Sequence, residues 1–317
     1  ETLDYDATTP DGTPGTGTNR VGYAIDAAGN WTGRVRIYPT LGVTNTTTYI
    51  VSPLNQYTNV NGAKQWYDAK GNYYSDGTNS YYYDYQNRMY QSYFPGTGIT
   101  YSNVYDVVGR WVGRKRSAVW NRYYYAGWQL IEERNNAGAL QAKYVYGAGL
   151  DEPVRMYRSS TYYYYLSDGL GNVTEVLDAS GNVVEKYTYD IYGAPTIRNS
   201  AGTVLSATAI GNRWLFTGRD WDAEQQAYNY RYRWYSPSLG RFLQTDPIRR
   251  GADDNLYRYV YNAPINLTDA KGLDPAFAPG IGMFSGLAAS QQVAAAEKAA
   301  PFVAGVAVGA GVAVITV

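Results

Sequence analysis

The chain has 317 residues, with 27 basic and 27 acidic side chains and neither Cys nor His. Without these two residue types there is no disulfide, no thiol nucleophile, no Cys/His zinc site and no catalytic triad with an imidazole base. The balanced charge argues against nucleic-acid binding, which requires a basic excess, and we expect neither a metal nor another cofactor.

Residues 1–20 have the composition of a linker-like N-terminal arm. Residues 8–15 read Thr-Thr-Pro-Asp-Gly-Thr-Pro-Gly. Small polar residues mixed with Pro and Gly cannot bury a core, so we expect an arm rather than a folded unit. The chain starts at Glu1 with neither Met nor a signal peptide, which is typical of a processed or excised product.

A short motif recurs from about residue 21 onward: an apolar residue, Asp, two variable residues, Gly, and then Asn or Arg. The Asp opens a turn by accepting backbone N–H groups, and the Gly supplies a positive φ. Each copy therefore predicts the tip of a β-hairpin. The best copies have their turn residues at Asp26 and Gly29, Asp68 and Gly71, Asp106 and Gly109, and Asp178 and Gly181. Weaker copies begin at Asp84, Asp168 and Asp190.

The segments between these turns are rich in tyrosine. The chain has 36 Tyr and only 6 Phe. Tyr suits a strand that is apolar along the ring and wet at the hydroxyl, so we expect about fifteen to twenty half-buried strands. Each motif supplies a single acid, whereas calcium takes six to eight oxygen ligands, so the motifs predict turns rather than calcium sites.

The most distinctive stretch runs from residue 228 to residue 273. Its first eight residues alternate, which predicts one strand with Tyr228, Tyr230, Tyr232 and Trp234 on the same face. A turn at residues 236–240 follows. The remaining parts are Arg241-Phe242-Leu243-Gln244-Thr245-Asp246-Pro247, Asn255-Leu256-Tyr257-Arg258-Tyr259-Val260-Tyr261-Asn262-Ala263-Pro264 and Asp269-Ala270-Lys271-Gly272-Leu273.

This succession resembles the C-terminal signature of the Rhs/YD-repeat family, which includes bacterial Rhs toxins, the C components of insecticidal toxin complexes, and teneurins. The resemblance implies an all-β fold in which antiparallel hairpins spiral into a shell-like sheet. Closed cages of this family use a much longer chain. We therefore expect residues 21–273 to form a partial YD-repeat shell, followed by a short hydrophobic tail.

The resemblance also implies a self-cleavage site. In Rhs toxins and toxin-complex C components, an aspartyl site cuts the chain after the Leu of an Asp-Pro-x-Gly-Leu motif. By that similarity the acids are Asp246 and Asp269, Arg241 stabilises charge, and the cut follows Leu273. Ala270 stands where the family has Pro, so the turn lacks the residue that would fix φ.

The chemistry that two such acids perform is general. Two nearby carboxylates share one proton, so one activates water while the other protonates the leaving group. The alternative is that Asp246 and Asp269 only cap turns, like the acids of the repeats. At most, then, the chain is an aspartyl autoprotease that acts in cis.

Residues 274–317 form an Ala/Gly/Val-rich tail. Residues 285–300 predict a short helix, which Pro301 ends. Residues 302–317 carry no charge. They are at the lower length limit for a membrane span, so we favour burial within the shell or against another copy over membrane contact.

Two functions fit these features. The first is a secreted or surface-exposed YD-repeat structural protein that self-assembles as a homo-oligomer into a shell, fibre or surface layer, because open sheet edges invite pairing. The second is a C-terminal fragment of an Rhs-type toxin cage that cleaves itself after Leu273. Both place the protein outside the cell or at its surface, where the clustered Tyr and Trp offer a possible glycan or cell-surface contact.

Overall fold

The computed structural model describes residues 2–5, 19–38, 42–248, 254–273 and 275–277. These residues form 27 β-strands and two short 3-10 helices, and no α-helix occurs among them. The all-β prediction is confirmed. The strand count exceeds the expected number because several strands, such as β6 (Ala63–Lys64) and β25 (Arg241–Phe242), are only two residues long.

Most strands pair with their neighbours in sequence. A six-stranded sheet contains β1 (Thr2–Tyr5), β2 (Asn19–Ile25), β3 (Trp31–Tyr38), β4 (Val43–Val51), β5 (Tyr57–Val60) and β6. A fifteen-stranded sheet contains β7 (Trp66–Tyr67), β8 (Tyr73–Ser75), β9 (Ser80–Tyr83), β10 (Met89–Phe94), β11 (Ile99–Tyr105), β12 (Trp111–Arg116), β13 (Val119–Ala126), β14 (Gln129–Asn135), β15 (Leu140–Tyr146), β16 (Pro153–Arg158), β17 (Thr161–Ser167), β18 (Val173–Leu177), β19 (Val183–Tyr189), β20 (Pro195–Asn199) and β21 (Val204–Leu205).

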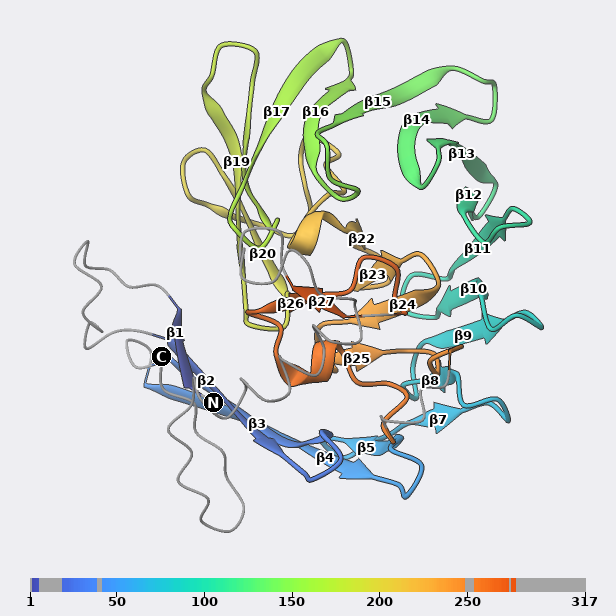
Figure 1. Ribbon diagram of the computed structural model, residues 1–317, viewed down its shortest axis with the longest axis vertical. Helices are drawn as coiled ribbons and strands as arrows, with labels where there is room; N and C mark the ends of the chain where they lie inside the picture. Colours follow the sequence, from blue (N-terminus) through green and yellow to red (C-terminus); the bar gives the residue numbers. More distant parts are fainter. Residues whose placement is uncertain (1, 6–18, 39–41, 249–253, 274, 278–317) are drawn as a thin grey trace.

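The fifteen-stranded sheet forms a curved wall. In Figure 1 this wall surrounds the smaller sheets of the C-terminal part. A four-stranded sheet contains β22 (Asp220–Asp222), β23 (Ala227–Tyr230), β24 (Arg233–Ser236) and β25, and a two-stranded sheet contains β26 (Leu267–Thr268) and β27 (Ala276–Phe277). The 3-10 helices are η2 (Phe216–Gly218) and η3 (Val260–Asn262). Side chains from the wall and from the central sheets share one buried aromatic core.

Described strands occur in both end segments of the chain: β1 and the start of β2 lie within residues 1–20, and β27 lies after residue 273. Strand β1 pairs antiparallel with β2 in the six-stranded sheet. Residues 6–18 lie outside the described residues, as do the expected helix at 285–300 and the uncharged stretch 302–317. Within the described part of the chain, no helix is long and apolar enough to cross a membrane.

The repeated motifs form the predicted turns. In a typical copy, Oδ1 of Asp68 accepts the backbone N–H groups of Lys70 and Asn72, both at 2.9 Å. The turn glycines all adopt positive φ, with values of 79° at Gly29, 85° at Gly71, 90° at Gly109 and 83° at Gly181. Local hydrogen bonding and backbone freedom therefore account for the hairpin tips.

The preference for Tyr over Phe has a structural cause that the sequence analysis missed. Five Tyr residues near the ends of strands donate their hydroxyl to a carbonyl at the start of the preceding strand. The donor and acceptor pairs are Tyr83 and Tyr73, Tyr105 and Met89, Tyr125 and Trp111, Tyr146 and Leu130, and Tyr189 and Val173. Burial raises the pKa of all five hydroxyls, so they remain protonated donors.

Buried ion pairs connect strand β14 of the wall to strand β22 of the four-stranded sheet. Arg213 contacts Glu133 of β14 at 2.8 Å and Asp220 of β22 at 2.6 Å. Burial raises the pKa of the Asp220 carboxyl. Removing either partner of such a pair would leave an uncompensated buried charge, so these contacts fix where the central strands sit on the wall.

Candidate functional site

The site is organised by a hairpin where the sequence predicted a single strand. Residues 228–235 do not form one strand: β23 ends at Tyr230, β24 begins at Arg233, and Tyr230 pairs with Arg233. Arg231 takes a φ of 65° in the two-residue turn. Tyr230 is fully buried while Tyr232 is 38% exposed, so the predicted common face is wrong at the turn.

The segment 269–273 lies directly against this hairpin. The backbone N–H of Tyr232 donates to the carbonyl of Lys271 at 3.2 Å. Gly272 has a φ of 70°, and a Cβ there would lie 2.7 Å from the Tyr230 carbonyl oxygen. Only Gly fits at this position, because both the conformation and the close backbone approach exclude a side chain.

Arg233 brings the two predicted acids together. Its Nη2 lies 3.1 Å from Oδ2 of Asp246 and 3.5 Å from Oδ2 of Asp269. The side chains of Arg233 and Asp269 are buried, and that of Asp246 is 13% exposed. The Nε of the same guanidinium donates to the carbonyl of Gly272 at 2.5 Å. One cation thus contacts both carboxylates and the backbone beside Leu273.

Each acid also caps its own turn through its other oxygen. Oδ1 of Asp269 accepts the backbone N–H groups of Lys271, Gly272 and Leu273 at 3.2, 2.7 and 3.0 Å. Oδ1 of Asp246 accepts the N–H of Ile248 at 2.9 Å. The turn-capping alternative and the paired-acid alternative are therefore compatible, since they use different oxygens of the same carboxylates.

Both acids, Arg233 and Leu273 line one small cavity. Its volume is about 20 Å³, which is enough for one water molecule. The cavity places polar groups that hold or move protons beside the residue after which a cut was predicted. No group of three or more acidic side chains suited to holding a metal ion occurs among the described residues.

The side chain of Arg241 does not take the position expected for it. Its Nη1 donates to the carbonyl of Asn55 and its Nη2 to Oδ1 of Asn30, both at 2.6 Å. Its guanidinium also stacks 3.5 Å from the centre of the Tyr57 ring. Arg241 thus connects β25 to Asn30 and Asn55 in the N-terminal part of the chain. The cation that contacts both acids is Arg233.

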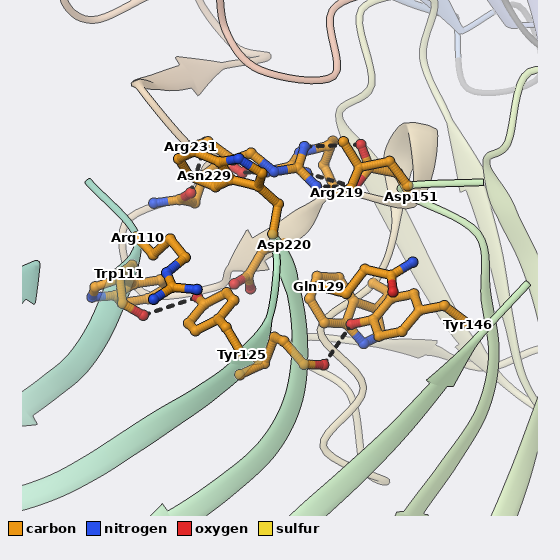
Figure 2. A pocket seen from close by; sticks show the side chains of 14 residues that line it. Arg110, Trp111, Tyr125, Gln129, Tyr146, Asp151, Arg219, Asp220, Asn229 and Arg231 are labelled. Atoms are coloured by element: carbon orange, nitrogen blue, oxygen red, sulfur yellow. Dashed lines mark hydrogen bonds and ion pairs between the residues drawn. The ribbon is translucent and has the colours of Figure 1, made fainter. Parts of the chain in front are cut away.

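A second pocket is lined by residues of the wall and by Arg231 of the same hairpin, and Figure 2 shows it. At one side of it, Asp151 contacts the guanidinium groups of both Arg219 and Arg231. Asp220 lies at the same pocket. Arg231 and Arg233 thus belong to one hairpin but contact different carboxylates. Arg231 contacts Asp151, and Arg233 contacts Asp246 and Asp269.

The chain has relatives among toxin proteins. No family model matches it. It is 27% identical over 226 residues to the tRNA nuclease WapA of Bacillus subtilis, an alignment that covers 69% of this chain and 9% of WapA. It is 28% identical over 155 residues to the toxin subunit YenC1 of Yersinia entomophaga, covering 49% of this chain and 15% of YenC1. The chain thus spans a small part of each relative.

A solved structure has a similar fold. The Photorhabdus luminescens Tc holotoxin pore, with a mutation in its TccC3 component, matches with a TM-score of 0.62 at 21% identity, over 82% of this chain and 13% of that one. The fold is one that occurs in Tc toxins. Its large antiparallel sheets agree with the predicted shell of hairpins.

Proposed function

We propose that this chain is the C-terminal part of an Rhs-type toxin cage and that it cuts itself once, after Leu273. The observation that carries the proposal is the single guanidinium nitrogen of Arg233 that contacts both Asp246 and Asp269 beside that residue. Similarity to WapA and YenC1 supports the toxin-cage hypothesis better than a self-assembling structural protein. The chain would act outside the producing cell or at its surface.

The proposed reaction is hydrolysis of the Leu273–Asp274 peptide bond. One carboxylate takes a proton from water as the oxygen adds to the Leu273 carbonyl carbon, and the other carboxyl gives a proton to the leaving nitrogen. Water thereby supplies a hydroxyl to the new C-terminus and a proton to the new amine. Arg233 holds both acids and the Gly272 carbonyl, so the reacting groups meet without a search.

The geometry favours a single cut in cis. Leu273 is held in the cavity because its own backbone N–H donates to Asp269. Folding therefore brings the bond to the acids, and no other substrate is required. The segment after residue 273 would then no longer be covalently joined to the shell.

Intact-mass measurement of the full chain tests the proposal. The wild type should yield a 1–273 product and a 274–317 peptide, while Asp269→Asn and Asp246→Asn should remain whole with an unchanged circular dichroism spectrum. Asp68→Asn is the matched control, because Asp68 makes similar turn bonds without Arg233 and should be cut normally. An intact wild type, or a cut Asp269→Asn chain, would contradict the proposal.

A further inference from the structure

Residues 269–273, which hold the proposed cut site, contain Ala270 where the related motif has Pro. An Ala leaves both backbone dihedrals free, so the shape of residues 269–273 depends on the hydrogen bonds that Asp269 accepts within the segment and on contacts from outside it. Arg231 supplies one of these contacts, because its Nη1 donates to the Ala270 carbonyl. The same guanidinium is almost completely buried, with its side chain 7% exposed.

Arg231 is itself held by Asp151, which belongs to the wall. Nη1 of Arg231 lies 3.0 Å from Oδ2 of Asp151, and Nη2 lies 2.6 Å from Oδ1. Two parallel bonds of this kind fix the plane of a guanidinium as well as its position. Asp151 lies in the connection between β15 and β16, so a loop of the fifteen-stranded sheet supplies the carboxylate that holds Arg231.

Asp151 also separates two cations that would otherwise repel each other. Arg219 contacts Oδ1 of Asp151 at 2.8 Å, and the Arg219 side chain is 4% exposed. Burial and the neighbouring Arg219 lower the pKa of Arg231, while Asp151 opposes that effect. Without the carboxylate, Arg231 would lose its ion-pair partner beside Arg219, and the repulsion between the two cations would favour a position of Arg231 away from Ala270.

The backbone around Asp151 lies close to Gly218. A Cβ at Gly218, in η2, would lie 2.0 Å from the Asp151 carbonyl oxygen. The connection between β15 and β16 therefore packs directly against η2. Figure 2 shows Asp151 and both arginines gathered at this junction.

We propose that Arg231 and Asp151 are positioning residues for self-cleavage, and that they make the cut conditional on docking of the β15–β16 connection onto the central hairpin. This inference rests on the proposed function, since it names what sets the geometry of that same site. Arg231 reaches the segment at the Ala270 carbonyl, three residues before the proposed cut. Together Arg231 and Asp151 hold the Ala270 carbonyl, and through it the turn that presents Leu273 to the acids.

The test compares variants for cutting and for order at residues 271–273. In Asp151→Asn and Arg231→Met, the cutting rate per folded molecule should fall about 10- to 100-fold, because a small misplacement costs this much. Arg231→Lys keeps one donor and one charge without the paired bonds, so it should lie between these variants and the wild type. Arg110→Met is the control, since Arg110 lines the same pocket but bonds to Asp106 and Gly127.

Rates are followed by intact mass during cell-free synthesis, and tryptophan fluorescence gives the folded fraction. Backbone hydrogen exchange at residues 271–273 is the second readout, and should accelerate about tenfold or more in Asp151→Asn but not in Arg110→Met. Wild-type cutting and wild-type exchange in Asp151→Asn would overturn the inference. An uncut wild type would defeat the proposed function and any role of these residues in cutting, while the exchange comparison would still decide whether Asp151 orders the segment.

Discussion

The turn at Asp68 and the turn at Asp269 use the same local device with different surroundings. In both, Oδ1 accepts backbone N–H groups two and four residues further along the chain. In the first, Oδ2 accepts the side-chain amide of Asn72 from the same turn at 2.8 Å. In the second, Oδ2 faces Arg233, which comes from a separate hairpin and also contacts Asp246.

This difference shows that capping a turn and taking part in acid–base chemistry require different contacts of the same carboxylate. A capped turn needs only short-range sequence, and the chain builds many of them. A carboxylate becomes a candidate for acid–base work when distant residues bring a second acid and a cation to the oxygen that does not cap the turn. We therefore expect changes at distant contacts to separate the two kinds of turn more sharply than changes within the turns themselves.

The largest expected effect is at Arg233, with Arg241 as the comparison. Arg233→Met removes the cation between the acids and should slow cutting by at least about 100-fold, as loss of a charge-stabilising donor does. Arg241→Met should leave the cutting rate of folded molecules unchanged and lower stability by about 1–3 kcal/mol, because the carbonyl of Asn55 loses its partner.

Intact mass and urea unfolding measure the two effects separately. If Arg241→Met stopped cutting while the protein remained folded, Arg241 would regain the role that the sequence first assigned to it. If Arg233→Met were cut at the wild-type rate, the contact of one guanidinium with both acids would have no chemical consequence.

The sequence predicted the repeat turns because each one is encoded within a few residues. It also predicted a site at Asp246, Asp269 and Leu273, which the structure places around one cavity. It placed Arg241 beside the acids, whereas the arginine that contacts both of them is Arg233. Arg241 is nearer to Asp246 along the chain, but the strand it occupies points its side chain toward Asn30, whereas Arg233 reaches both acids only after a hairpin forms.

That hairpin was missed because its turn contains no Gly, Pro, Asn or Asp. Alternating Tyr and Arg indicate a continuous strand. The local turn signal is Asn229, whose Oδ1 accepts the backbone N–H of Arg231, the residue with positive φ. The Tyr hydroxyl bonds between adjacent strands were also not predicted, because they depend on how neighbouring strands pair.

An intermediate effect is expected from the glycines of the turns. Gly181→Ala meets no atom within 4 Å, so its cost is the backbone strain of about 1 kcal/mol. At Gly71 a Cβ would lie 2.7 Å from the Tyr257 hydroxyl and 2.8 Å from Thr245 Cγ2, so we expect about 2–3 kcal/mol for Gly71→Ala.

Gly272→Ala adds a functional consequence to the same comparison. The new Cβ would push the segment away from the Tyr230 carbonyl, so cutting should stop in molecules that remain folded. Urea unfolding should rank Gly71→Ala above Gly181→Ala, and both of those variants should still be cut. Equal costs at Gly71 and Gly181 would mean that the close contacts at Gly71 relax freely.

The smallest expected effect is the pH response of an isolated repeat turn at Asp178. The backbone N–H and side-chain amide of Asn182 lower the pKa of Asp178 from its ordinary value of 3.8. Because the pKa is lower in the folded chain than in the unfolded chain, the ionised Asp178 stabilises the turn above that ordinary value. The stabilisation is lost as the pH falls through the folded pKa.

The chemical shift of the Asn182 backbone N–H, followed by NMR as the pH is lowered from neutrality, should report this loss directly. The shift should titrate with a midpoint below 3.8 in the wild type and stay flat in Asp178→Asn, because the amide cannot ionise. A midpoint at or above 3.8 would show that the capping bonds do not favour the charged form in solution. Asp178→Asn should be cut as fast as the wild type, because its turn shares the capping device of Asp269 but has no Arg233.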